Sequence, residues 1–60
     1  MNKNQVSCEG IYEYRESKKA DIVFVNVFEH NREIFVFFPK KDKCILLSDI
    51  SDTAIFSKWI

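Results

Sequence analysis

Runs rich in Val, Ile and Phe alternate with short polar connectors through the middle of the chain. The apolar runs cover residues 22–28, 33–38 and 44–47, and the connectors between them are EHNR and the lysine-rich segment PKKDK. Short β-branched and aromatic runs separated in this way are typical of consecutive antiparallel strands. The pattern therefore predicts three strands over these ranges. Asn31 is the expected left-handed turn residue between the first two, because Asn tolerates positive φ.

An earlier strand is predicted over residues 6–15, where apolar and polar positions alternate. Val6, Cys8, Tyr12 and Tyr14 fall on one side of it, and most side chains on the other side are charged or polar. This alternation indicates a strand with one buried face, on which the Cys8 thiol would be a buried structural group. Gly10 interrupts the pattern and is the expected bend. Residues 16–21 form a polar connector.

The C-terminal segment SDTAIFSKWI fits two conformations. Ile55, Phe56, Trp59 and Ile60 have the spacing of one helix face, and Ser51 or Asp52 could cap the first turn. A short C-terminal helix is preferred, because a four-stranded meander needs a cover for its apolar face. In the alternative, residues 54–60 form a fifth strand, which gives a small barrel with an SH3-like strand order but no residue signature of that family.

The sequence thus predicts a mainly β (α+β) single domain over residues 1–60, a four-stranded antiparallel meander followed by a short helix. Both faces of its central hairpin are apolar. An even-numbered loop at residues 30–31 would pair Val27 with Ile34 and Val25 with Val36. The faces would then be aliphatic on one side (Val23, Val25, Val27, Ile34, Val36, Phe38) and largely aromatic on the other (Ile22, Phe24, Asn26, Phe28, Phe35, Phe37). Because large exposed apolar patches are uncommon on monomers, both faces require a cover from curvature, a second copy or a partner.

Composition narrows the function classes. The 60 residues carry 9 basic and 9 acidic side chains, so the net charge gives no general attraction to nucleic acid. The N-terminal residues lack an apolar signal region and no apolar stretch is long enough to span a membrane, so we expect a cytoplasmic protein with reduced thiols. An excess of Lys over Arg, with many Asn, Ile and Phe, is typical of an AT-rich genome such as that of a phage.

Candidate catalytic and ligand chemistry is sparse. The sequence has one His, two Cys far apart and one Gly, which does not predict a Cys–His nucleophile pair, a tetrahedral zinc site or a glycine-rich phosphate loop. We expect no enzymatic activity, cofactor, metal or small-molecule substrate.

The preferred function is a small protein-binding module, a regulator or inhibitor encoded by a phage or mobile element. It would act by direct contact with a host protein or as a homodimer. The excess apolar strand surface is the reason, because a compact domain without catalytic groups commonly acts by contact. The residues expected to bind the partner are Val23, Val25, Val27, Ile34, Val36 and Trp59.

The alternative function is binding of single-stranded nucleic acid. Aromatic side chains on a sheet face can stack on bases, and lysines can contact the phosphates. In a meander the first and third connectors lie at the same end of the sheet, so their lysines would form one basic pole. The residues expected for this function are Phe24, Phe35, Phe37, Lys18, Lys19, Lys40, Lys41 and Lys43.

Overall fold

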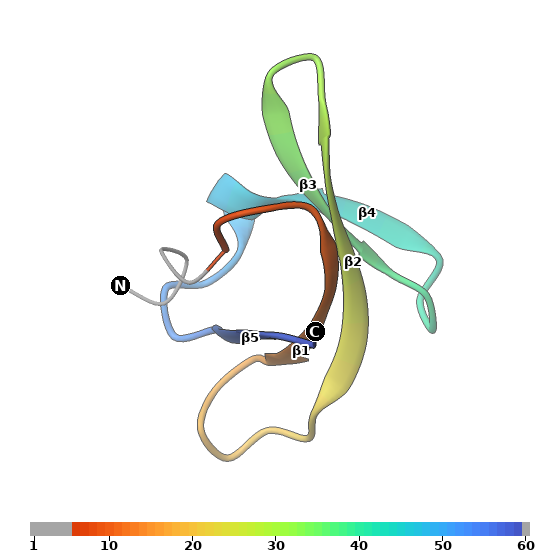
Figure 1. Cartoon of the computed structure of the whole chain (residues 1–60). Coiled ribbons are helices and arrows are strands. Elements are labelled where there is room, and N and C mark those ends of the chain that lie inside the picture. The colour runs from red at the N-terminus through yellow and green to blue at the C-terminus, as the bar shows by residue number, and fades with distance from the viewer. Residues whose placement is uncertain (1–5, 60) are drawn as a thin grey trace.

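One antiparallel sheet of five strands forms the fold, and the computed structural model describes it over residues 6–59 (Figure 1). The elements in chain order are β1 (Gly10–Arg15), β2 (Val23–His30), β3 (Glu33–Phe38), β4 (Lys43–Leu46), the short 3-10 helix η2 (Leu47–Asp49) and β5 (Ile55–Lys58). The strand order is β4-β3-β2-β1-β5. The predicted β meander is confirmed, and the central strands begin and end within two residues of their predicted bounds.

The predicted C-terminal helix is wrong, because residues Ile55–Lys58 form β5 and pair with β1. A turn precedes the strand, closed by a bond from the Ala54 N–H to the Ser51 carbonyl at 3.1 Å. The Thr53 hydroxyl donates to the Glu16 carbonyl at 2.9 Å and so fixes this turn to the end of β1. Phe56 then packs into the interior, and the open edge of β1 gains a partner. The fifth strand of the alternative interpretation is therefore present.

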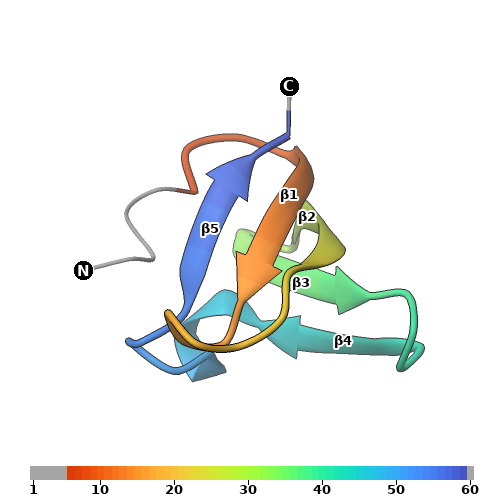
Figure 2. The same cartoon turned by 90° about the horizontal axis from the view of Figure 1, so that it is seen from below.

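The sheet coils strongly, so that one of its faces becomes the interior (Figures 1 and 2). Eight residues form the core, from β1, β2, β3, β5 and the segment between η2 and β5, namely Tyr12, Val25, Val27, Val36, Phe38, Ile50, Ala54 and Phe56. Within residues 6–59 no ladder joins β4 to β5, and η2 with the following turn connects these two edge strands. The sheet is therefore a coiled open sheet, without the hydrogen-bonded closure of a barrel.

The hairpin of β2 and β3 has a different register from the predicted one. Its two-residue turn lies at Asn31 and Arg32, which have φ of 53° and 67°. Val27 consequently pairs with Val36, where the sequence predicted Ile34. Since the loop still has two residues, every side chain keeps its predicted face although the pairing shifts. The expectation that Asn31 adopts a left-handed conformation is confirmed.

The first strand is shorter than predicted, because the chain bends at Gly10. Gly10 has φ of 140°, a conformation that L side chains rarely adopt, and residues 6–9 leave the direction of β1 there. The Tyr12 hydroxyl donates to the Cys8 carbonyl at 2.7 Å and accepts from the Cys8 N–H at 3.3 Å. The Glu9 carboxylate accepts from the Glu29 N–H at 2.7 Å. Cys8 is exposed on this segment, so its predicted burial is wrong.

Two sequence-based expectations concern residues outside this description. The N-terminal residues 1–5, in which no signal region is predicted, and Ile60, a member of the predicted helical stripe, both lie outside the described residues. Between residues 6 and 59, no helix has the length and apolar content that crossing a membrane requires.

Candidate functional site

The aliphatic hairpin face predicted to bind a partner forms part of the core. Val25, Val27 and Val36 are buried, and Val23 and Ile34 pack against them with partial exposure. The coiling of the sheet causes this burial, because it folds the aliphatic face around Tyr12 and Phe56. The three buried valines cannot form a contact surface in the folded chain, whereas Val23 and Ile34 are only partly covered. That part of the prediction is therefore corrected.

The opposite, outer face of the sheet carries the exposed apolar side chains. Ile11 is 49% exposed, Phe24 50% and Trp59 48%, although they come from β1, β2 and the residue after β5. The Trp59 N–H donates to the Ile11 carbonyl at 2.9 Å, which extends the β5 pairing by one residue. The Phe24 and Trp59 rings meet edge to face with centroids 5.7 Å apart. We call Ile11, Phe24 and Trp59 the outer patch.

A hollow of about 270 Å³ lies within the outer patch and is lined by these three side chains alone. A second hollow of about 320 Å³ adjoins it, reaching across Asn26 to Phe37 and Pro39. The apolar surface therefore continues from the β5 edge across the sheet to the end of β3.

Sequence reasoning identified Trp59 but not the rest of the outer patch as a protein-contact surface. The sequence pattern places Phe24 with the nucleic-acid alternative and gives no role to Ile11. Ile11 lies on the same side of β1 as Glu13 and Arg15, the side that the alternation predicts to be polar. An isoleucine on the polar side of a strand is the signal that could have identified Ile11 as a contact residue.

Three other ring side chains of the outer face, Phe28, His30 and Phe35, pack against one another. Phe28 and Phe35 stack with centroids 5.6 Å apart and an interplanar angle of 18°, and His30 lies against Phe35 at 6.4 Å. Phe35 and Phe37 are both partly buried. Of the three phenylalanines predicted to stack on bases, only Phe24 is half exposed.

The five predicted lysines do not form one basic pole. Lys18 and Lys19 lie in the connector from β1 to β2, whereas Lys40, Lys41 and Lys43 lie around the turn from β3 to β4. Figures 1 and 2 show these two connectors projecting from separate places on the molecule. The twist of the sheet separates them, because strand ends that lie together in a flat sheet diverge in a coiled one.

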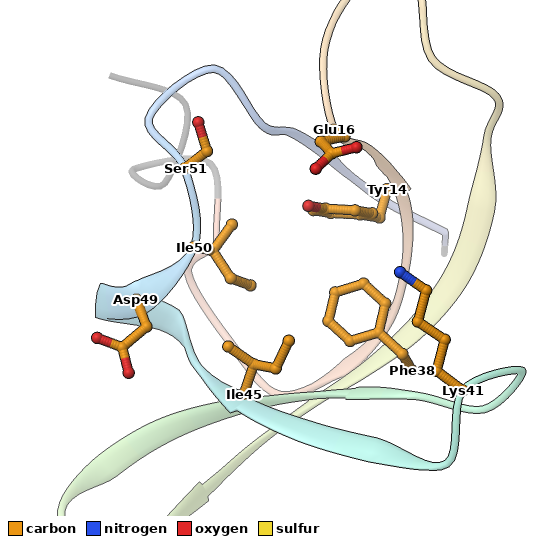
Figure 3. Close-up of a pocket in the computed structure, with 8 residues that line it drawn as sticks. All are labelled: Tyr14, Glu16, Phe38, Lys41, Ile45, Asp49, Ile50 and Ser51. Carbon is orange, nitrogen blue, oxygen red and sulfur yellow. The ribbon is translucent and has the colours of Figure 1, made fainter.

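A second candidate site lies at one end of the coiled sheet, where a hollow of about 200 Å³ opens between β1, the turn after β3, and η2 (Figure 3). We call it the end hollow, and it is lined by Tyr14, Glu16, Phe38, Lys41, Ile45, Asp49, Ile50 and Ser51. The Tyr14 ring meets Phe38 edge to face at 5.0 Å. The Lys41 ammonium lies 5.9 Å from the centroid of the Phe38 ring.

Electrostatics in the end hollow act on Tyr14. Burial raises the pKa of the Tyr14 hydroxyl above its ordinary value of 10.0, and the negative charge of Glu16 raises it further. Both effects disfavour the phenolate, because it would lie in a less hydrated position beside a carboxylate. Tyr14 therefore keeps its proton throughout the physiological pH range.

Other reactive side chains are dispersed over the fold. Cys8 and Cys44 are both exposed free thiols. Among residues 6–59 there is no group of three or more His, Cys, Asp or Glu side chains that could hold a metal ion.

No protein-family model, curated protein or solved structure matches this chain. The two surfaces described above are therefore the basis for the functional proposal.

Proposed function

We propose that this protein is a non-enzymatic protein-binding module that contacts its partner through the outer patch. The observation that carries the proposal is the meeting of Ile11, Phe24 and Trp59, from three different strand regions, around one hollow lined only by apolar atoms. Trp is enriched among the residues that dominate interface energies. The proposed function, protein binding, is the one that the sequence predicted. Of the contact residues predicted from sequence, only Trp59 belongs to the outer patch.

The exposed area of the outer patch is large enough to contribute to binding. Complete burial of one aromatic side chain removes about 150–250 Å² from solvent. Phe24 and Trp59 are each about half exposed, so the two together expose roughly the area of one such side chain. Covering that area contributes about 4–6 kcal/mol at about 25 cal/mol per Å², before the entropic cost of association is subtracted.

In this proposal the protein acts in the cytoplasm as a regulator or inhibitor that contacts a host protein. Alternatively, the outer patch contacts a second copy of the chain and forms a homodimer. The support for a phage or mobile-element origin is the compositional bias of the chain. The nucleic-acid alternative has weaker support, because its lysines form two separate groups and Glu13 lies opposite Phe24 in the ladder.

The single tryptophan of the chain provides a direct test, because Trp59 is itself part of the outer patch. Its fluorescence emission should shift to shorter wavelength when the patch is covered. We would measure this emission from micromolar to millimolar protein concentration, to detect self-association. We would then measure it with proteins captured from the source cell's lysate, and with short DNA and RNA strands at two salt concentrations.

Matched variants make this test specific. Ile11→Thr and Phe24→Thr each place a β-branched residue that suits a strand at the position, and each should weaken partner binding at least tenfold. Ile22→Thr is the control, because Ile22 is equally exposed at 48% but does not line the hollow. Unchanged binding by both patch variants would contradict the proposal. Salt-dependent binding of an oligonucleotide without any protein contact would favour the alternative.

A further inference from the structure

We propose that the end hollow binds a side-chain cation with N–H donors, the guanidinium of an arginine or the ammonium of a lysine, from a bound polypeptide. This inference concerns a surface distinct from the outer patch. It rests on the aromatic wall of the hollow, the carboxylates at its rim and the position of one lysine of the chain itself.

The wall of the end hollow is apolar and rigid. Phe38 and Ile50 belong to the core, and the Tyr14 ring is held edge to face against Phe38 and tilted against Phe56 at 5.1 Å. Ile45 completes the apolar lining. Aromatic rings attract cations through their negative faces, and this attraction increases when the cation is partly shielded from water. A fixed aromatic wall of this kind suits the flat guanidinium or the end of a lysine chain.

The rim of the end hollow carries two carboxylates, and they come from separate elements. Glu16 follows β1 and Asp49 lies in η2. Figure 3 shows Glu16 beside Tyr14 and Asp49 across the opening, with the Asp49 carboxylate pointing away from the aromatic rings. Against these two negative charges stands the positive charge of Lys41. The three charged groups together leave the site negative, which favours a cation over an anion. Carboxylates also accept hydrogen bonds from N–H donors, which a quaternary ammonium could not give.

The position of Lys41 shows that the hollow accommodates a cation. Its ammonium lies 5.9 Å from the Phe38 centroid, within the range of a cation–π contact. Lys41 is exposed and lies in the turn between β3 and β4, so its long side chain can leave the ring at small energetic cost. We therefore infer that Lys41 occupies part of the site in the absence of a partner. An incoming cation would displace it.

The test uses small probes that carry the side chain alone, N-acetyl-arginine amide and N-acetyl-lysine amide. N-acetyl-citrulline amide is the control probe, because citrulline has nearly the shape of arginine without its charge. Backbone amide NMR spectra of the intact protein would be recorded during titration with each probe. We expect shifts concentrated at Tyr14, Lys41 and Asp49 for the two cations and none for citrulline. The comparison of arginine with lysine identifies which of the two cations the site prefers.

Substitutions at the rim decide between a cation site and other uses of the hollow. Lys41→Met removes the internal competitor and should tighten cation binding by roughly threefold to tenfold, the factor that a contact of about 1 kcal/mol represents. Lys40→Met is its matched control, since it removes the same charge from a neighbouring residue that does not line the hollow. Glu16→Gln and Asp49→Asn should each weaken binding severalfold.

Several outcomes would overturn this inference. Equal binding of the citrulline probe would indicate an apolar pocket without charge selection. Weaker cation binding by Lys41→Met would mean that Lys41 helps to form the site and does not compete for it. Equal effects of Lys41→Met and Lys40→Met would indicate only a general change in net charge. The amide spectrum of each variant reports whether it remains folded. None of these outcomes depends on whether the outer patch binds a protein.

Discussion

Tyr12 and Tyr14 lie two residues apart on the same face of β1, yet they serve different purposes. The Tyr12 hydroxyl is buried and bonds both backbone groups of Cys8, so it holds the N-terminal segment against the sheet. Tyr14 lines the end hollow, where Glu16 lies close enough to affect its ionisation. The alternation of β1 predicted that both rings face inward, but only the surrounding elements distinguish their roles.

The raised pKa of Tyr14 predicts a loss of stability in alkali. In the unfolded chain this hydroxyl ionises near its ordinary pKa, while in the folded protein it stays protonated to higher pH. The contribution of protonated Tyr14 to the free energy of unfolding is complete below about pH 10. It is lost as the pH rises through the pKa of the folded state, because the unfolded state then binds fewer protons than the folded state. Urea unfolding at neutral pH and at about pH 10.5 would measure this loss.

The variant Glu16→Gln tests the cause of that shift. Without the carboxylate, the pKa of Tyr14 should fall toward 10.0 but stay above it, because burial is the larger cause and is unchanged. The NMR chemical shift of the Tyr14 Cζ atom during a pH titration reports this pKa directly. An identical pKa in the wild type and in Glu16→Gln would show that Glu16 does not act on Tyr14.

At the scale of elements, the turn between β2 and β3 shows what local sequence can and cannot specify. Asn31 was expected to have positive φ, and it does. Arg32 also has positive φ, which nothing in an arginine side chain favours. Cross-strand packing of Val27 against Val36 favours the observed register, so the sheet imposes this conformation on Arg32. A two-residue turn of this type ordinarily prefers Gly at that position.

The variant Arg32→Gly should therefore stabilise the protein. Relief of the left-handed strain is partly offset by the greater freedom of Gly in the unfolded chain, which leaves a net gain of about 0.5–1 kcal/mol. Arg32→Ala is the control, because it removes the charged side chain but keeps the strain, and its effect should stay within about 0.5 kcal/mol. Urea unfolding gives both values. A stabilisation by Ala equal to that by Gly would mean that the side chain, and not the backbone, is the cause.

At the scale of the whole molecule, a chain of 60 residues has little stability to lose. Domains gain about 0.05–0.15 kcal/mol per residue, which gives roughly 3–9 kcal/mol here. Much of the core depends on the pairing of β5 with β1, because that pairing brings Phe56 against both Tyr12 and Tyr14. The fold should therefore be sensitive to changes at Phe56 and tolerant of changes on the outer face.

Two alanine substitutions compare these surfaces. Phe56→Ala should cost about 3–5 kcal/mol, the usual loss for a buried Phe, and leave much of the protein unfolded at room temperature. Phe24→Ala should cost less than about 2 kcal/mol, because half of this side chain is already exposed. Circular dichroism during thermal unfolding would measure both. A loss of stability for Phe24→Ala as large as that for Phe56→Ala would mean that Phe24 stabilises the fold, and this would contradict a role of the outer patch in partner binding alone.

Most strand positions and both faces of the central hairpin could be predicted from sequence, because alternation and connector composition are local properties. The candidate sites could not. Sequence alternation showed that Val25 and Phe24 point to opposite sides, but it carried no information about which side becomes the interior. Similarly, the lysines of two connectors were expected together, and the coiling of the sheet separates them.

The amino-acid sequence by itself determined a small β domain with an apolar ribbon at its centre, since the alternation within the first four strands and the polar connectors between them are properties of neighbouring residues. Tertiary structure alone decided that the tail becomes a strand, that the aliphatic side is enclosed and that Ile11, Phe24 and Trp59 share one surface. These outcomes depend on contacts between segments far apart in the chain. In particular, the free edge of β1 offered the tail hydrogen bonds and a place for Phe56 that a separate helix could not match.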